Sequence, residues 1–292
     1  GRNSTHILAR ALDHILGDLK DQGLTIVVDD GLLAAETWED LLDLWDRVFE
    51  RFEKYNLKMN LLKLKLISTE VTFLGRNISR EGLSLDPKRV RALHEMKDFD
   101  TLGDVATLLY ASQWSRRWIC GFESIVAPIR RFMNTHLKGT KRTMAVCKRI
   151  KLSTNGWGPE EQAALEKLKV ALAATVPLDF YDENMIIVVL TDASETHWGS
   201  IVMQCPKDQA HLPIGKRDLR PLGWYSGVFR GAQLNWTIPE KEGFAIKATF
   251  SKADAMLGKP FQLHTDSNII RYVFGNMESS YGGAHFANEL VR

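Results

Sequence analysis

The 292-residue sequence contains no apolar run that approaches the roughly 18 residues of a membrane span, and its N-terminus lacks a charged region followed by a hydrophobic one. Cysteine is scarce. The three cysteines, Cys120, Cys147 and Cys205, are scattered and lack the paired spacing of a zinc site or a disulfide framework. These absences predict a protein without a membrane segment, in a reducing, intracellular and cytoplasmic location.

Acidic residues are absent between Glu123 and Glu160. This stretch is typical of a solvated linker, and it is also what phosphate binding requires. The net charge of +2 over the whole chain neither demands nor excludes a polyanionic partner. The basic residues of the stretch are Arg130, Arg131, Lys138, Lys141, Arg142, Lys148, Arg149 and Lys151.

An unbroken apolar run in MIIVVLTDAS ends at a carboxylate, Asp192. The run predicts a strand buried on both faces with an acid at its exit. A carboxylate removed from water needs a cation, a metal ion or hydrogen-bond donors beside it. Glu242 in TIPEKEGFAI and Asp266 in FQLHTDSN are candidates for a shared metal site. The competing interpretation is that Asp192 only caps the turn DASE.

Two glutamates compete for the metal role in TIPEKEGFAI. Thr237 and Glu240 have the spacing of a capping box at the start of a helix, which gives Glu240 a structural role. Glu242 lies two residues further on and faces elsewhere. We therefore assign the predicted metal role to Glu242.

The N-terminal part predicts a helix over 5–19, followed by GLTIVVDDGLLAAE. This second segment indicates a β-hairpin with a carboxylate-rich turn at Asp29, Asp30 and Gly31. Aspartate and glycine are common turn residues, but two acids at a hairpin tip can also hold magnesium. A helix over 37–55 with core aromatics follows, and then strands in LKLKLIS and VTFLG.

From Asp86 onward the pattern favours helices, with start signals at Asp86, Thr101 and Gly158. After a composition break near Asn155 come a helix, three strands, a helix, the strand FQLHTD and a last helix that continues to Arg292. We predict an α/β (α+β) chain whose last part is a mixed sheet with helices.

The motif order VVDD, FLG, EGLSLDP, WGPEEQAALEKLK, TDAS, WGSIVMQ, TIPEKEGFAI and HTDSN resembles the pol polyprotein of gypsy-type LTR retrotransposons. The resemblance covers nearly the whole chain and implies a fragment of a reverse transcriptase with ribonuclease H. It implies a partial palm over 1–83, a helical thumb with the basic linker over 84–154, and a ribonuclease H-like domain over 155–292.

The same resemblance implies roles for single residues. Asp29 and Asp30 are the paired catalytic aspartates of the palm, and Val27 stands where the family usually has tyrosine. A further palm aspartate is expected before Gly1, and a fourth ribonuclease H acid beyond Arg292. The family's segment that steadies the primer end matches Phe73, Leu74 and Gly75, and its ribonuclease H metal ligands match Asp192, Glu242 and Asp266.

Polymerase and nuclease chemistry would both use two Mg²⁺ ions, with Mn²⁺ as an alternative. The expected partners are an RNA/DNA hybrid, a primer–template and, in the full-length enzyme, dNTPs. Virus-like particles are an alternative location within the cell, and the oligomeric state is left open. The basic residues expected to follow the phosphates are Arg130, Arg131, Lys141 and Arg142.

Two other hypotheses remain open at this point. The first is a nucleic-acid-binding relic of a retroelement, in which the fold persists without chemistry. The second is a working nuclease for which the palm-like half is only a structural partner. Loss of metal binding on Asp192→Asn would favour a live site. Under the structural-partner hypothesis, Asp29→Asn would leave hybrid cleavage untouched.

Overall fold

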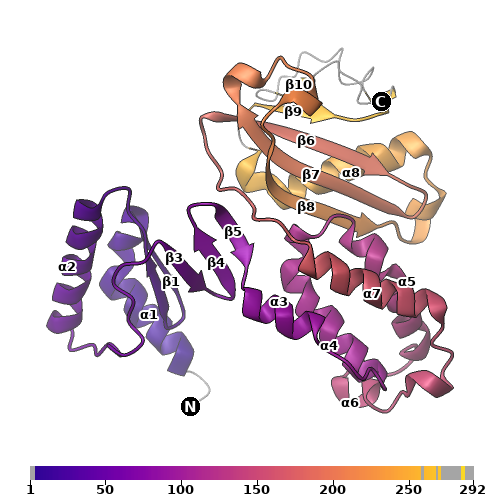
Figure 1. Ribbon diagram of the computed structural model, residues 1–292, viewed down its shortest axis with the longest axis horizontal. Coiled ribbons are helices and arrows are strands. Elements are labelled where there is room, and N and C mark those ends of the chain that lie inside the picture. Colours follow the sequence, from indigo (N-terminus) through magenta and orange to yellow (C-terminus); the bar gives the residue numbers. More distant parts are fainter. Residues whose placement is uncertain (1–3, 258–259, 268, 271–283, 287–292) are drawn as a thin grey trace. The chain divides into compact units, whose positions relative to one another are not determined.

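The computed structural model describes residues 4–257, 260–267, 269–270 and 284–286. The chain divides into two compact units, Gly1–Leu74 and Gly75–Arg292 (Figure 1). The last predicted helix, continuing to Arg292, lies largely outside the described residues. Among the described helices, none is long and apolar enough to cross a bilayer.

The first unit packs two helices against a short hairpin. Its elements are α1 (Ser4–Leu16), the 3-10 helix η1 (Gly17–Gln22), β1 (Leu24–Val27), β2 (Asp30–Leu33), α2 (Trp38–Lys54) and β3 (Glu70–Phe73). Strands β1 and β2 pair antiparallel, which confirms the predicted hairpin. The core of the unit consists of Leu12, Ile15, Leu16, Leu19, Leu24, Leu44 and Val48.

Helix α2 begins where its cap predicts, because the Thr37 hydroxyl accepts a hydrogen bond from the Asp40 amide at 3.1 Å. The prediction that its aromatic residues are core is only partly right. Trp45 is buried, but the side chains of Trp38 and Tyr55 are 54% and 44% exposed. The buried residues of α2 are Leu44, Trp45 and Val48, and the sequence pattern did not include Leu44.

The strand predicted for LKLKLIS is wrong. The segment forms turns and loop, and Leu62 is almost fully exposed. A strand needs a hydrogen-bonded neighbour, and no described strand pairs with this segment. The segment is held instead by a side chain, because the Trp45 indole N–H donates to the Leu66 carbonyl at 2.9 Å. The strand predicted for VTFLG is confirmed as β3.

The second unit begins with a β-hairpin that the sequence pattern did not predict. Strands β4 (Arg76–Ser79) and β5 (Gly82–Leu85) pair antiparallel. Leu83 exchanges two backbone hydrogen bonds with Leu178, at 2.7 and 2.9 Å. Gly82 is required here, because its φ is +120° and a Cβ would lie only 2.3 Å from the Leu178 carbonyl oxygen.

Helices form the next layer of this unit (Figure 1). Their core is mostly aliphatic and includes Leu102, Val105, Leu109, Ile129 and Leu168. The elements are α3 (Pro87–His94), α4 (Leu102–Ser112), η2 (Gln113–Trp118), α5 (Phe122–His136), α6 (Met144–Cys147), η3 (Leu152–Thr154) and α7 (Pro159–Ala173).

The predicted helix starts are confirmed by their hydrogen bonds. Asp86 caps α3 by accepting from the Lys88 amide at 2.9 Å. The Thr101 amide donates to the Asp104 carboxylate at 2.8 Å, which completes the capping box of α4. The basic segment after α5 is not simply a solvated linker, because the Leu102 amide donates to the Ile150 carbonyl at 2.9 Å. The boundary at 154/155 stays a prediction.

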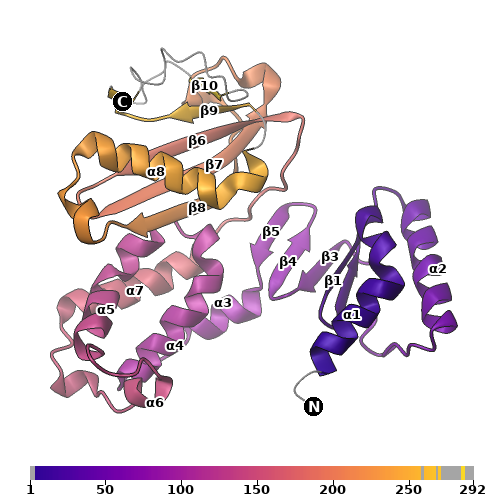
Figure 2. The same cartoon turned by 180° about the vertical axis from the view of Figure 1, so that it is seen from behind.

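The sheet that follows is mixed, as predicted. Its strand order is β10-β9-β6-β7-β8, with β6 parallel to β9 and antiparallel to β7. Helix α8 lies against one face of the sheet (Figure 2). The elements are β6 (Met185–Ala193), β7 (His197–Pro206), β8 (Arg220–Val228), α8 (Ile238–Ala253), β9 (Phe261–His264) and β10 (Ala284–Phe286), with 3-10 turns η4 (Lys207–Gln209), η5 (Ile214–Lys216), η6 (Gly231–Asn235) and η7 (Asp254–Met256).

Candidate metal centre

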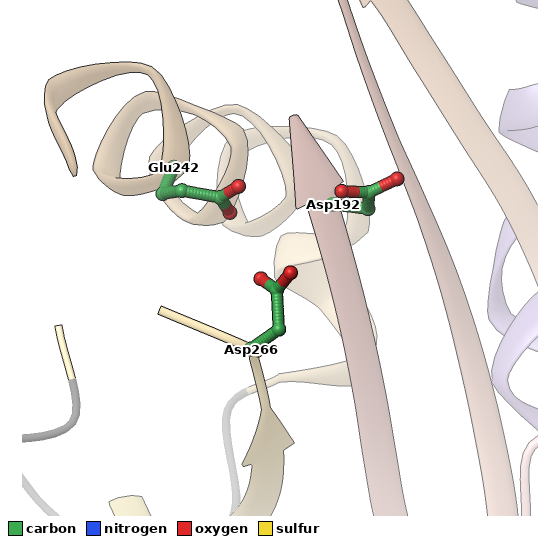
Figure 3. Close-up of side chains that lie close together, drawn as sticks. All are labelled: Asp192, Glu242 and Asp266. Carbon is green, nitrogen blue, oxygen red and sulfur yellow. The ribbon is translucent and has the colours of Figure 1, made fainter. Parts of the chain in front are cut away.

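Three acids from separate elements meet at one edge of the sheet (Figure 3). Asp192 lies near the end of β6, and Asp266 follows the end of β9. Because β6 and β9 run parallel, their carboxyl ends lie at the same edge. Glu242 comes from α8, which packs against β6. One carboxylate oxygen from each acid lies within 4.8 Å of one from each of the others.

Glu242 is the buried member of this acid cluster, with only 3% of its surface exposed. One carboxylate oxygen, Oε1, accepts a hydrogen bond of 3.2 Å from the Ala193 amide. The other, Oε2, is buried without a hydrogen-bond partner among the described residues. Burial, and then the negative charges of Asp266 and Asp192, raise the pKa of Glu242 to about 7.

This donor set fits a hard divalent cation. The cluster offers only carboxylate oxygens, which are the ligands that Mg²⁺ prefers. Bringing three carboxylates together is unfavourable unless positive charge or protons compensate. The unpartnered Oε2 of Glu242 and the raised pKa both show that the described protein groups do not supply this compensation.

Glu240 has the structural role that its spacing predicts. Its carboxylate accepts hydrogen bonds from the amide and hydroxyl of Thr237, at 2.7 and 2.8 Å, at the start of α8. These bonds lower the pKa of Glu240. Its neighbour Glu242 is the one that reaches the acid cluster. Glu242 therefore lies in the acid cluster while Glu240 caps the helix, and the metal role of Glu242 stays a prediction.

The predicted palm acids lie at the tip of the β1–β2 hairpin. Asp29 occupies the turn with Val28, whose φ is +63°, and Asp30 already pairs with Val27 in the strands. The predicted turn at Asp29, Asp30 and Gly31 is therefore displaced, because the turn consists of Val28 and Asp29, while Asp30 and Gly31 belong to β2. Both acids are exposed. Within the described residues they join no group of three potential metal ligands.

The segment predicted to steady a primer end contains a backbone reversal. Phe73 ends β3, while Leu74 and Gly75 have positive φ values of 51° and 73°. Glycine adopts such a conformation without strain, whereas leucine rarely does. The side chain of Leu74 is 38% exposed. Nucleic-acid contact by these residues stays a prediction.

Two of the four predicted phosphate-binding residues already have acidic partners. Arg130 forms an ion pair of 3.1 Å with buried Glu123, and Arg131 pairs with Glu160. These acids are the two that flank the acid-free stretch of the sequence. Lys141 and Arg142 lie exposed between α5 and α6. A surplus of positive charge therefore remains mainly in the second half of the stretch.

Residues of η2 and α5 that the sequence did not single out are bonded to strand β8. Arg116 donates to the Ser226 carbonyl and Arg117 to the Leu222 carbonyl, each at 3.1 Å. The Ser226 hydroxyl accepts from the Glu123 amide at 3.1 Å. A cavity of about 600 Å³ lies between this segment and the sheet, and Asp192 and Asp266 line it. The paired arginines in WSRRW are a signal that the sequence analysis did not use and that could have indicated these contacts.

Comparison with protein families matches two parts of the chain. Residues 1–78 match the reverse transcriptase (RNA-dependent DNA polymerase) family, and residues 182–290 match the RNase H-like domain found in reverse transcriptase. The second match contains the whole acid cluster. The first contains the β1–β2 hairpin with Asp29 and Asp30.

Retrotransposon polyproteins are similar over nearly the full chain. The retrovirus-related Pol polyprotein from transposon opus of Drosophila melanogaster is 26% identical over 94% of this chain. The transposon Tf2-3 polyprotein of Schizosaccharomyces pombe is 22% identical over 91% of it. The chain spans only 26% and 18% of the lengths of these polyproteins.

Solved structures of the foamy viral protease-reverse transcriptase share the fold. The structure in complex with double-stranded DNA aligns over 99% of this chain and 59% of that one, with a TM-score of 0.74 and 21% identity. The structure in complex with an RNA/DNA hybrid aligns over 99% and 38%, with a TM-score of 0.72 and 20% identity. The chain is therefore similar to the reverse transcriptase family over residues 1–78 and to the RNase H-like domain found in reverse transcriptase over residues 182–290.

Proposed function

We propose that this chain is part of a retroelement Pol protein whose RNase H-like domain hydrolyses the RNA strand of RNA/DNA hybrids. The reverse transcriptase domain would extend a DNA primer on an RNA template in the full-length protein. The gypsy-type assignment and a cytoplasmic location, or one in virus-like particles, are parts of the same proposal. The observation that carries it is the acid cluster of Asp192, Glu242 and Asp266.

Asp192, Glu242 and Asp266 would hold Mg²⁺, or Mn²⁺ in its place. When bound, the metal would lower the pKa of a water nucleophile and neutralise charge that develops on the phosphate oxygens. The exposed Asp192 and Asp266 present their carboxylates toward solvent, where a phosphodiester can approach. Glu242 reaches the same place from the buried side of the cluster.

The protein's own contribution is to hold the three carboxylates in position before substrate arrives. The Ala193 amide fixes one oxygen of Glu242 at 3.2 Å, and the Thr237–Glu240 capping box fixes the start of its helix. Strands β6 and β9 fix the other two acids through their parallel pairing. Preorganisation of this kind reduces the rearrangement needed when metal and substrate bind.

The palm hairpin supports the polymerase part of the proposal less directly. Asp29 and Asp30 would hold Mg²⁺ for addition of dNTPs, with ligands from elsewhere in the full-length protein. Phe73, Leu74 and Gly75 would contact the primer, and Lys141 and Arg142 would contact phosphates of the nucleic acid. Support comes from the family match over residues 1–78 and from the nucleic-acid complexes of the foamy viral enzyme.

A second candidate function is nucleic-acid binding without polymerase chemistry. The observation in its favour is the hairpin tip, where Val27 and Val28 are 37% and 41% exposed beside Asp29. Val27 stands where the family usually has tyrosine, so the hairpin tip lacks that aromatic side chain. This candidate concerns the palm and leaves the acid cluster of the RNase H-like domain unaffected.

Strand-specific cleavage tests the proposed nuclease. An RNA/DNA hybrid labelled on either the RNA or the DNA strand is incubated with the chain and Mg²⁺, beside double-stranded DNA and single-stranded RNA of the same sequence. We expect cuts in the RNA strand of the hybrid alone, and none with EDTA. Binding of the hybrid without cleavage, equal with Mg²⁺ and with EDTA, would contradict the proposal and favour a non-catalytic binder.

A further inference from the structure

A cluster of arginines and tryptophans joins the β4–β5 hairpin to η2 and α3. The Arg76 guanidinium lies over the Trp114 ring at 4.4 Å and over the Trp118 ring at 5.2 Å. Arg89 of α3 also lies over Trp114, at 5.7 Å. Arg117, next to Trp118, lies over the Tyr225 ring of β8 at 5.6 Å. We call Arg76, Arg89, Arg117, Trp114 and Trp118 the arginine–tryptophan cluster.

Among the described residues, no acid pairs with the positive charge of this cluster. Within the described part of the chain, none of its three arginines forms an ion pair. Burial, and then the positive charge of Arg117, lower the pKa of Arg76. Both effects disfavour the charged side chain, and no described carboxylate offsets them. Six other arginines do form ion pairs with acids, namely Arg47, Arg51, Arg116, Arg130, Arg131 and Arg220.

The cluster also holds donors that have no acceptor in the described part of the chain. The Nε atoms of Arg76 and Arg117 and the indole Nε1 of Trp114 are buried without a hydrogen-bond partner among the described residues. Their neighbours are fixed, because Trp118 donates to the Leu83 carbonyl at 2.9 Å and Arg117 to the Leu222 carbonyl at 3.1 Å. A buried donor left unpaired is costly, so an acceptor from outside the chain would be favourable here.

The carboxylate nearest in sequence to Arg89 belongs to Asp86, which caps helix α3. Asp86 accepts a hydrogen bond from the Lys88 amide. Its own amide donates to the Gly75 carbonyl at 3.3 Å, which keeps the Gly75 turn beside the cluster. A Cβ on Gly75 would lie 3.1 Å from Arg89 Nη1 and 3.9 Å from Trp114 Nε1. The cluster therefore adjoins the turn that is proposed to contact a primer.

We propose that Arg76, Arg89 and Arg117 form a binding site for a phosphate group of the nucleic-acid backbone. Guanidinium groups match the geometry of phosphate oxygens, and arginines stacked on aromatic rings are preordered for such contact. The choice of a backbone phosphodiester rests on the proposed function of the chain. A terminal phosphate of a nucleotide or inorganic phosphate offers the same chemistry, and the experiment separates these sources.

Binding of a fluorescent RNA/DNA hybrid is measured by anisotropy in EDTA over a range of salt concentrations. Arg76→Gln and the exposed Arg89→Gln each remove one charge from the cluster. The matched control is Arg80→Gln, which removes the same charge at the far turn of the β4–β5 hairpin. We expect the two cluster variants to bind about five- to tenfold more weakly, with a salt slope reduced by about 1. Arg80→Gln should bind as the wild type does.

Arg89→Gln keeps the test valid if Arg76→Gln fails to fold, because Arg89 is on the surface of α3. Equal affinity and equal salt slope for wild type and Arg89→Gln would overturn the proposal. If the wild type cleaves the hybrid and the cluster variants bind it as tightly as the wild type does, the phosphate site is overturned and the nuclease function is supported. If the cluster variants bind the hybrid more weakly but the wild type does not cleave it, the nuclease function is overturned and the phosphate site is supported.

Neutral methylphosphonate linkages identify the source of the phosphate. Hybrids carrying one such linkage at successive positions are bound by the wild type and by Arg89→Gln. We expect one linkage position at which the affinity of the wild type for the hybrid drops to that of Arg89→Gln. The affinity of Arg89→Gln should not change at that position. If no position on either strand does this, and inorganic phosphate competes with the hybrid only in the wild type, the site takes a free phosphate. That outcome would overturn the backbone assignment.

Discussion

The carboxylate of Glu242 on helix α8 accepts a hydrogen bond of 3.2 Å from the backbone amide of Ala193, the residue that follows Asp192 on strand β6. This bond ties the helix to the strand at the position of the acid cluster. As a result, Oε2 of Glu242 is buried, and the Glu242 carboxylate lies near those of Asp192 and Asp266. The consequences for stability, metal binding and cleavage can each be measured.

The first prediction concerns pH in the absence of metal. The pKa of Glu242 is raised from 4.5 to about 7, so the folded protein holds a proton that the unfolded chain releases. The resulting stabilisation is fully present below about pH 4.5 and is lost as the pH rises through about 7. The free energy of unfolding should fall by at most about 3 kcal/mol across this window because of Glu242.

Urea unfolding in EDTA at pH 5 and pH 8 measures this effect, with Glu242→Gln as the comparison. The variant carries no titrating group at this position, so its stability relative to wild type should increase between the two pH values. Addition of Mg²⁺ at pH 8 should stabilise the wild type and have little effect on the variant. A difference between the two proteins that does not change with pH would refute the assignment.

The second prediction separates the two glutamates of α8. Glu242→Gln should reduce hybrid cleavage at least about 100-fold, because it removes a ligand charge from the cluster. Glu240→Gln should lower the melting temperature slightly, since it weakens the capping box, and should retain most of the cleavage rate. Circular dichroism melting and a cleavage time course check both. Equal loss of cleavage in the two variants would mean that α8 needs its cap for activity.

The third prediction concerns the palm acids. Asp29 lies in the β1–β2 turn of the first unit, whereas the acid cluster lies wholly in the second unit. Asp29→Asn should therefore leave the hybrid cleavage rate within about twofold of wild type. A large loss of cleavage would show that the nuclease depends on the palm hairpin.

The fourth prediction concerns the buried carboxylate of Glu123. It pairs with Arg116 at 3.3 Å and Arg130 at 3.1 Å, and its side chain is 9% exposed. Glu123→Gln would leave two arginines without their acid, so we expect a loss of about 2 kcal/mol in the free energy of unfolding. Glu160→Gln, which breaks the exposed pair with Arg131, is the control and should cost at most about 1 kcal/mol. Equal stability of the Glu123 variant and wild type would contradict this.

The acid cluster could be predicted because its signals are local. Asp192 ends an apolar run, and the capping box accounts for Glu240 and so leaves Glu242 free for another role. The helix caps at Asp86 and Thr101 are local in the same way. The hydrogen bonds of these three helix caps connect residues within a few positions of one another.

Other features depend on partners that are distant in the sequence. The LKLKLIS alternation predicts a strand, but a strand also needs a neighbour, and the segment lacks one among the described strands. Arg116 bonds to Ser226, 110 residues away, and no periodicity carries that information. The arginine–tryptophan cluster likewise combines Arg76 with Trp114 and Trp118. These contacts depend on how the elements pack against one another, which local sequence patterns do not specify.

Cleavage of a labelled RNA/DNA hybrid by wild type and Asp192→Asn, in Mg²⁺ and in Mn²⁺, tests the central claim most directly. Asp208→Asn, which removes an exposed acid from η4, is the matched control. The acid cluster predicts that wild type and Asp208→Asn cut the RNA strand and that Asp192→Asn does not. Cleavage by Asp192→Asn at the wild-type rate, or no cleavage by any of the three proteins in either metal, would contradict it.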